Sequence, residues 1–170
     1  MILPYYDKKP VIDSSVYVAS NAVISGDVEI GAQSSVWFHT VIRGDVAPTR
    51  IGKRVNIQDQ SMLHQSPNRT LVIEDDVTIG HQVILHSSII RKNALIGMGS
   101  TILDGAEIGE GAFIGAGSLV PPGKTIPPHT LALGRPAKVV RDLTDADVKE
   151  MERVRTEYVD RGQYYKNIDV

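Results

Sequence analysis

The sequence contains no cysteine, which excludes disulfide bonds, thiolate metal ligands and a cysteine nucleophile. Aromatic residues are scarce at 5%, so a hydrophobic core must consist mainly of valine, isoleucine and leucine. No apolar run approaches the roughly 20 residues that cross a bilayer as a helix. The segment MILPYYDKKP lacks a basic stretch followed by an apolar one, so no secretory signal is indicated. We therefore expect a cytoplasmic protein.

An excess of charge of one sign is also lacking. Lys and Arg number 18 and Asp and Glu number 20, which gives a formal net charge of -2. This balance favours neither nucleic acid nor an anionic membrane as a partner, so we expect neither. The length of 170 residues suits one domain with a substantial core and one appended helix.

Aliphatic residues recur every six positions through most of the chain. The steps that depart from six are nine residues after Ile42, ten after Leu63 and five after Leu85. The recurring positions are Ile12, Val18, Ile24, Ile30, Val36, Ile42, Ile51, Ile57, Leu63, Ile73, Ile79, Leu85, Ile90, Ile96, Ile102, Ile108, Ile114, Val120 and Ile126. A period of six fits neither an α-helix nor a simple alternating strand, but three units of strand and turn close one coil of about 18 residues.

This period predicts an all-β fold, a left-handed parallel β-helix of hexapeptide repeats with the aliphatic residues stacked inside. Several of the aliphatics are followed by glycine, which suits the tight corners of such a coil. The alternative is a β-sandwich of short strands. Its turns would not recur every six residues over more than about a hundred residues, so we favour the β-helix.

The repeat gives way to a short link and then to a helical pattern. Thr144 and Asp147 have the spacing of a helix cap. Apolar residues follow at three- and four-residue spacings at Val148, Met151, Val154, Tyr158 and Tyr165. We predict a helix that runs to about Lys166 and packs on the β-helix or on a neighbouring subunit. The chain is thus divided into a β-helix domain, residues 1–140, and a C-terminal α-helix, residues 141–170.

Three of the five histidines have related positions in the repeat. His64 and His86 each follow a repeat aliphatic, and the 22 residues between them equal one coil of 18 plus an insertion of four. They should therefore lie one above the other, at a separation that suits two ligands of one metal ion. His81 falls on the preceding face of the same coil and cannot easily reach the other two. His39 and His129 fit no such geometry, and we interpret them as structural or surface residues.

A second copy of the chain could bring His81 to the other two histidines. If three prisms pack in parallel about a three-fold axis, the face that carries His64 and His86 meets the face that carries His81 of the next subunit. The homotrimer would then hold three equivalent sites between subunits. Three histidines with one open coordination position are typical of a catalytic rather than a structural zinc site.

The sequence also resembles a known family. RGD at residues 43–45, NIQD at residues 56–59, His64, IGHQVILH at residues 79–86 and LIGMGSTILDGA at residues 95–106 are similar to the γ-class carbonic anhydrases. The resemblance covers roughly residues 10–140, and the final helix is also similar. Hexapeptide repeats alone would not identify this family, since acyltransferases share them. The resemblance implies a homotrimer with Zn²⁺, or alternatively Fe²⁺ or Co²⁺, and the reversible hydration of carbon dioxide to bicarbonate by a metal-bound hydroxide.

The resemblance also implies roles for individual residues. The metal ligands would be His64, His81 and His86. The side chains that position the metal-bound water and the substrate, or reach the site from the final helix, would be Gln58, Asn56 and Tyr158. An ionic cluster at the subunit contact would consist of Arg43, Asp45 and Asp59.

One feature of the best-known family members is missing. Those enzymes carry an acidic loop after the RGD motif, and its glutamates move protons, whereas this chain has VAPTR without a carboxylate. It therefore resembles the subgroup that lacks the loop, and a buffer or Tyr158 would have to carry the proton. Two other functions stay open. One is a non-catalytic metal-binding or scaffold protein, and the other is a hexapeptide-type acyl-transfer or thioester enzyme, which would need a coenzyme A pocket and a catalytic histidine free of metal.

Overall fold

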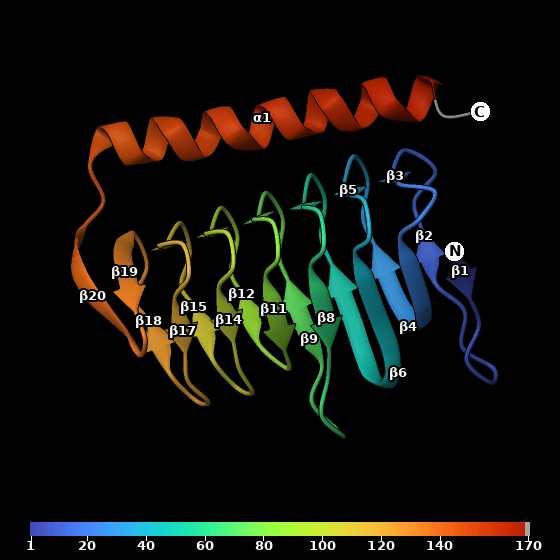
Figure 1. Cartoon of the computed structure of the whole chain (residues 1–170), viewed down its shortest axis with the longest axis horizontal. Coiled ribbons are helices and arrows are strands. Elements are labelled where there is room, and N and C mark those ends of the chain that lie inside the picture. Colours follow the sequence, from blue (N-terminus) through green and yellow to red (C-terminus); the bar gives the residue numbers. More distant parts are fainter. Residues whose placement is uncertain (169–170) are drawn as a thin grey trace.

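The computed structural model describes residues 1–168 and shows a left-handed parallel β-helix with one long helix along its side (Figure 1). Most strands are only two or three residues long, because a corner of the coil follows each of them. They form the three faces of a triangular prism, and the strands of the repeats pair in parallel with their equivalents in the next coil. The predicted fold class is therefore confirmed.

The strands can be assigned to the three faces from their pairing. The first face contains β1 (Ile2–Leu3), the first parts of β4 (Val23–Ile30) and β6 (Val41–Ile51), β8 (Met62–His64), β11 (Ile84–His86), β14 (Thr101–Ile102) and β17 (Leu119–Val120). The second face contains β2 (Val11–Ile12), the later parts of β4 and β6, β9 (Leu71–Ile73), β12 (Ile89–Ile90), β15 (Glu107–Ile108) and β18 (Thr125–Ile126). The third face contains β3 (Tyr17–Val18), β5 (Ser35–Val36), β7 (Asn56–Ile57), β10 (Thr78–Ile79), β13 (Leu95–Ile96), β16 (Phe113–Ile114) and β19 (Thr130–Gly134), with β20 (Ala137–Asp142) added antiparallel to β19.

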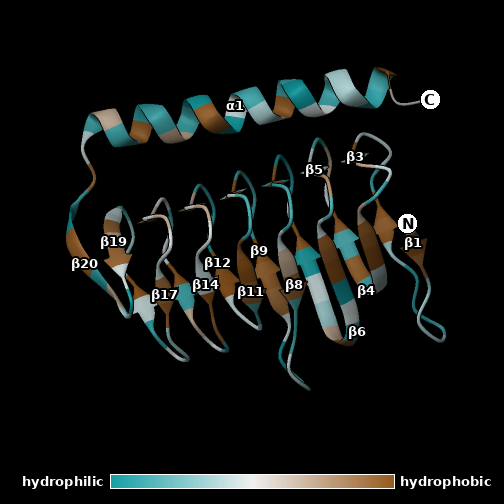
Figure 2. Cartoon of the chain, viewed as in Figure 1, coloured by the Kyte–Doolittle hydropathy of each residue, from teal (hydrophilic) through white to brown (hydrophobic). Residues whose placement is uncertain are grey.

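The core is a set of aliphatic columns inside the prism. On the first face Ile42, Leu63, Leu85 and Ile102 lie in register, and each is 0% exposed. Hydrophobic residues accordingly recur in the strands of successive coils (Figure 2). Complete burial of one such side chain contributes about 1.5–3 kcal/mol. The repeated aliphatic position is therefore the main source of stability, as the six-residue period predicts.

Gly97 shows why glycine follows several of the stacked aliphatics. A Cβ atom at this position would lie 2.6 Å from the backbone nitrogen of Ala116 and 2.6 Å from the carbonyl oxygen of Ile114. The two coils therefore approach too closely at this corner to admit a side chain.

Helix α1 (Asp145–Ile168) lies along the third face (Figure 1). It begins with the predicted cap, in which the backbone N–H of Thr144 donates to Asp147 Oδ2 at 2.7 Å and the N–H of Asp147 donates to Thr144 Oγ1 at 3.2 Å. Near its end, Gly162 lies over Ser35, whose Cβ would be 3.1 Å from a Cβ at the glycine. The glycine thus permits close packing of the helix on the prism, and the predicted helix is confirmed.

The division of the chain at residue 140 stays a prediction, since β20 continues across this position to Asp142. Among the residues that the structure describes, no helix is both long and apolar enough to cross a membrane. The cytoplasmic location also stays a prediction.

Candidate metal centre

His64 and His86 lie one above the other at one edge of the first face. They are the last residues of β8 and β11, and they pair directly in the register of these strands. Nδ1 of His64 is 3.2 Å from Nε2 of His86, and the ring centroids are 5.3 Å apart. The loop of residues 65–70 absorbs the insertion, so the two histidines occupy the same position in successive coils, as their spacing predicts.

Arg43 and Asp45, both in β6, lie beside this pair. Arg43 Nη1 donates to Asp45 Oδ2 at 2.6 Å, and Asp45 Oδ1 is 3.1 Å from His64 Nε2. Partial burial would raise the pKa of Asp45, but the hydrogen bonds from Arg43 and His64 outweigh it and lower the pKa below its ordinary value. Burial, and then the charge of Arg43, lower the pKa of His64. At neutral pH Asp45 is therefore charged and His64 is neutral, which is the form of imidazole that binds metals.

A carboxylate that the sequence did not single out, Asp104, completes this edge. Its Oδ2 is 2.9 Å from Nδ1 of His86. A hydrogen bond from the Ser66 side chain lowers the pKa of Asp104, burial opposes this shift, and the bond from His86 lowers the pKa further. Asp104 follows His86 by 18 residues, whereas one coil spans 17 residues here, since Leu85 pairs with Ile102. Counting repeats therefore does not place Asp104 at the position of His86.

The third predicted ligand, His81, lies at the opposite edge of the first face, in the corner between β10 and β11. Its Nδ1 is 2.8 Å from Asp59 Oδ2, and its Nε2 is 3.4 Å from the hydroxyl of Tyr158 in α1. The ring of Tyr158 is held edge-to-face against Trp37, with centroids 5.3 Å apart. Burial and then the charge of Asp59 raise the pKa of Tyr158. This tyrosine therefore keeps its proton at neutral pH.

Asn56 and Gln58 are buried in the same corner as His81, with exposed fractions of 2% and 4%. Gln58 Nε2 donates to Asn56 Oδ1 at 3.0 Å, and Asn56 Nδ2 donates to Thr78 Oγ1 at 2.9 Å. This chain of hydrogen bonds fixes the amide of Gln58, because its nitrogen is engaged as a donor while its oxygen can act as an acceptor. Gln58 also borders an apolar groove of about 220 Å³ between the third face and α1.

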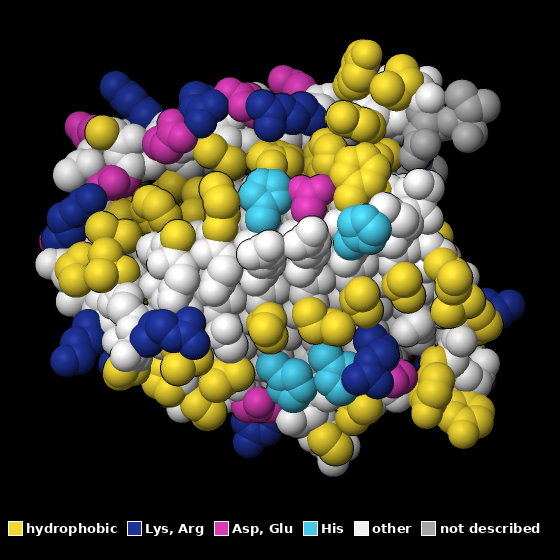
Figure 3. Space-filling view, viewed as in Figure 1, with side chains coloured by type: hydrophobic (Ala, Val, Ile, Leu, Met, Phe, Trp, Pro, Cys, Tyr) yellow, Lys and Arg dark blue, Asp and Glu magenta, His cyan; other side chains and the backbone are white. Residues whose placement is uncertain are grey.

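The candidate residues thus form two half-sites on opposite edges of the first face. The pair half-site consists of Arg43, Asp45, His64, His86 and Asp104. The single half-site consists of Asn56, Gln58, Asp59, His81 and Tyr158. Between them the face is apolar, with Met62 41% exposed and Ile84 44% exposed. Figure 3 shows histidine side chains at separate places on this side of the molecule, with hydrophobic side chains between them.

The predicted ionic cluster is divided between the two half-sites within one chain. Arg43 and Asp45 lie together, whereas Asp59 pairs with His81 across the face. Within residues 1–168 of a single chain, no three His, Cys, Asp or Glu side chains converge closely enough to hold a metal ion.

The pair half-site fits two ligands of one metal ion. Two nitrogen ligands at 2.0–2.1 Å from a tetrahedral zinc are about 3.3 Å apart, and the facing nitrogens of His64 and His86 are 3.2 Å apart. The other nitrogen of each ring contacts a carboxylate. Carboxylate–histidine pairs of this kind accompany metal ligands in general.

The structure also shows what replaces the acidic loop. Residues 46–50 lie within β6. Thr49 and Arg50 pair with β4 on one side and with β9 on the other, but the pairing of β6 with β4 shifts in register before Thr49. A bulge in β6 therefore occupies the place of the acidic loop.

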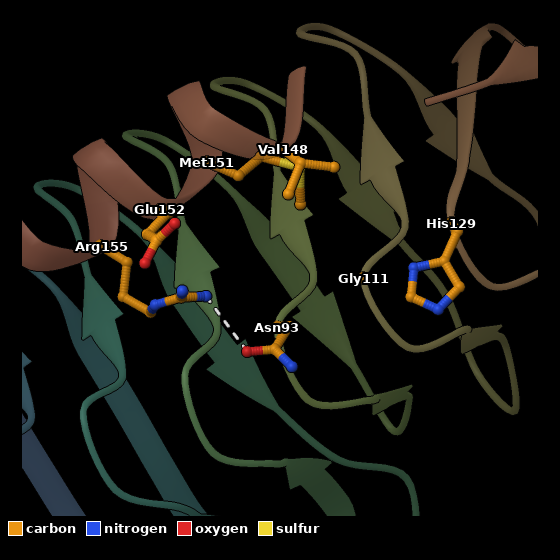
Figure 4. A pocket seen from close by; sticks show the side chains of 7 residues that line it. All are labelled: Asn93, Gly111, His129, Val148, Met151, Glu152 and Arg155. Carbon is orange, nitrogen blue, oxygen red and sulfur yellow. Dashed lines mark hydrogen bonds between the residues drawn. The ribbon is translucent and has the colours of Figure 1, made fainter. Parts of the chain in front are cut away.

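A separate cavity of about 260 Å³ lies between α1 and the corners of later coils (Figure 4). Arg155 Nη1 donates to Asn93 Oδ1 at 3.1 Å, the dashed line in Figure 4, and Arg155 Nε is 3.5 Å from Asp76. His129 lies across the cavity from Arg155 (Figure 4). Val148, which the sequence places in the apolar stripe, is 50% exposed here. The contacts of Arg155 with Asn93 and Asp76 hold the helix to the prism.

Neither His129 nor His39 belongs to a half-site. The ring of His39 contacts Asn21 Nδ2 at 3.2 Å. The interpretation of both histidines as structural or surface residues agrees with these positions.

Known proteins resemble this chain over nearly all of its length. Residues 87–122 match the family described as bacterial transferase hexapeptide (six repeats). A Geobacillus kaustophilus protein named carbonic anhydrase is 73% identical over 98% of this chain and 91% of its own length. A Bacillus subtilis protein named uncharacterized transferase YtoA is 74% identical over 98% of this chain and 97% of its own length. Mitochondrial gamma carbonic anhydrase 1 of Arabidopsis thaliana is 36% identical over 95% of this chain and 61% of its own length.

The chain therefore belongs to the γ-class carbonic anhydrase family of left-handed β-helix proteins built from hexapeptide repeats. Names of both kinds, carbonic anhydrase and transferase, occur among its relatives. The names of the relatives therefore do not distinguish the two activities, and the residues of the two half-sites are the basis for choosing between them.

Proposed function

We propose that this protein is a metal-dependent carbonic anhydrase, which converts carbon dioxide and water reversibly to bicarbonate and a proton. The observation that carries the proposal is the pair half-site, where two histidine nitrogens face each other at 3.2 Å. A hexapeptide acyltransferase would need a catalytic histidine free of metal, whereas here two histidine nitrogens face each other at the spacing of two ligands of one ion, and each ring is oriented by a carboxylate. The carbonic anhydrase names of relatives at 73% and 36% identity support the same activity.

In this proposal a second subunit completes the site. The two half-sites lie on opposite edges of the same face, so packing three chains in parallel about a three-fold axis brings the single half-site of one subunit to the pair half-site of the next. The contact would bury the exposed apolar surface of Met62 and Ile84. It would also bring Asp59 of the partner subunit to Arg43 and Asp45, which forms the ionic cluster expected from the sequence.

The ligand set of His64 and His86 with His81 of the partner subunit suits Zn²⁺, and imidazole also binds Fe²⁺ and Co²⁺. When bound, such an ion supplies a water molecule whose pKa is lowered to about 7.

The single half-site supplies the groups that orient the reactants. The amide oxygen of Gln58 would accept a hydrogen bond from the reactants, and Asn56 holds that amide in place. The protonated hydroxyl of Tyr158, 3.4 Å from His81 Nε2, would donate a hydrogen bond to them. The groove beside Gln58 is lined by Leu95 and Phe113 among others. It suits carbon dioxide because the groove and the molecule are both apolar.

Neither the segment that replaces the acidic loop nor Tyr158 offers a base for the proton that each hydration releases. Residues 46–50 contain no carboxylate, and the raised pKa of Tyr158 prevents it from accepting a proton at neutral pH. In this proposal a buffer base therefore removes the proton.

The test is a stopped-flow assay of carbon dioxide hydration with a pH indicator. The trimer is purified without air and loaded with zinc, cobalt or iron, and His81→Ala serves as a control. We expect a rate above that of the buffer which scales with bound metal, and loss of both metal and rate in the control. A fully loaded trimer that hydrates no carbon dioxide with any of these metals would contradict the proposal. Binding of coenzyme A by that protein would favour a transferase, and its absence would leave a scaffold.

A further inference from the structure

Asp104 contacts His86 across one coil of the β-helix. It follows β14, the strand that pairs with β11. Its Oδ2 accepts a hydrogen bond of 2.9 Å from His86 Nδ1, and the carboxylate is itself held by the side chain of Ser66. The side chains of His86 and Asp104 are 29% and 31% exposed, so the contact is partly shielded from water.

This hydrogen bond determines which nitrogen of His86 is available. A carboxylate accepts only, so the proton of neutral His86 resides on Nδ1 and leaves the lone pair on Nε2. At His64 the carboxylate of Asp45 lies 3.1 Å from Nε2, the opposite ring nitrogen, so the lone pair there is on Nδ1. The two lone-pair nitrogens are the two that face each other at 3.2 Å.

Two lone pairs at this distance repel each other unless a cation lies between them. Rotation of the His86 ring or transfer of its proton to Nε2 would relieve the repulsion in the absence of a metal. Either change breaks the hydrogen bond to Asp104. The carboxylate of Asp104 therefore opposes the relaxation that would remove a ligand from the site.

We infer that Asp104 is a positioning residue that holds His86 ready to bind the metal through Nε2, while Asp45 holds His64 to bind through Nδ1. This inference rests on the proposed metal site and adds to it a residue and a choice of ligand atoms. A carboxylate behind a ligating histidine also makes the histidine a better donor, and loss of such a partner typically weakens metal binding about 10–100-fold.

The experiment compares Asp104→Ala, the isosteric Asp104→Asn and the control Asp76→Asn in the full-length trimer. Asp76 is an ion-paired carboxylate of matching exposure, 30% against 31%, that lies outside both half-sites. Zinc affinity is measured by competition with a chelator, and the tautomer of His86 in the metal-free protein is measured by ¹⁵N NMR above pH 8. If the alanine variant does not fold, the comparison rests on Asp104→Asn.

We expect wild type and Asp76→Asn to bind zinc alike, with the His86 proton on Nδ1. Asp104→Ala should bind zinc about 10–100-fold more weakly and lose the preference for the Nδ1 proton. Asp104→Asn, which can still accept the hydrogen bond but lacks the charge, should fall between them. Unchanged affinity in both Asp104 variants, or a wild-type proton on Nε2, would overturn the inference while the proposed function stands. Failure of the wild-type trimer to bind zinc, iron or cobalt would overturn both.

Discussion

Replacing Ile84 with aspartate tests whether the first face forms the subunit contact. Ile84 is 44% exposed in the single chain, so the change should alter the stability of the isolated fold by less than about 0.5 kcal/mol. Because full burial of an isoleucine contributes about 1.5–3 kcal/mol, covering the exposed part contributes about 1 kcal/mol per subunit and about 3 kcal/mol per trimer. Its loss alone weakens assembly about 100-fold. Desolvation of the carboxylates weakens it further.

The assay is the mass of the protein by light scattering together with its zinc content after dialysis. Ile89→Asp is the control, because Ile89 is a partly exposed isoleucine on the second face of the same coil. We expect Ile84→Asp to dissociate and to lose zinc, while Ile89→Asp stays trimeric and loaded. An Ile84→Asp protein that remains a fully loaded trimer would show that the first face is not the contact, and a loaded monomer would show that the site needs no second subunit.

Three further substitutions test separate parts of the account. Gln58→Ala should lower kcat/KM about tenfold or more, whereas wild-type kcat should rise with buffer concentration because proton removal limits turnover; a kcat independent of buffer would reveal an internal proton acceptor. Asp147→Asn should lower Tm at pH 7, because hydrogen bonds from Arg141 and Thr144 hold the pKa of Asp147 well below its ordinary value. A depressed folded-state pKa stabilises the protein above the unfolded-state pKa of about 3.9, so the Tm difference should shrink as pH falls below about 4; an equal difference at every pH would exclude the charge as its cause. Gly97→Ala should reduce the free energy of unfolding in urea by about 1–3 kcal/mol through overpacking between coils, and an unchanged midpoint would show that the coils can separate freely.

Much of the fold could be predicted because its determinants are local and repeated. One position in six is aliphatic and is buried from Ile24 onward, so the period read along the chain gives the columns of the core directly. The same counting places His64 beside His86 despite the insertion between them. The cap formed by Thr144 and Asp147 spans only three residues and needs no tertiary information.

The division of the candidate residues into two half-sites could not be predicted in the same way. The family resemblance groups Asp59 with Arg43 and Asp45, yet within one chain Asp59 lies at the other edge of the first face and contacts His81. The contact of Tyr158 with His81 depends on α1 returning along the third face, and the path after β19 and β20 sets that direction. Such placements follow from tertiary structure rather than from the spacing within a repeat.

The sequence does not reveal the role of Asp104 for a related reason. It lies within a motif that supported the family resemblance, but a lone aspartate among hexapeptide repeats carries no metal-binding pattern of its own. Only the hydrogen bond to His86 across one coil distinguishes it from the other surface carboxylates.

The most direct test of a metal site shared between subunits is the zinc content of mixed trimers. His81→Ala lacks the single histidine and His86→Ala lacks one of the pair, so neither variant alone should bind much zinc. When the two are co-folded in equal amounts, every trimer with both kinds of subunit contains one contact where an intact His81 meets an intact pair. Random assembly should therefore restore about a quarter of the wild-type zinc content. A mixture that binds no more zinc than the separate variants would contradict the shared site.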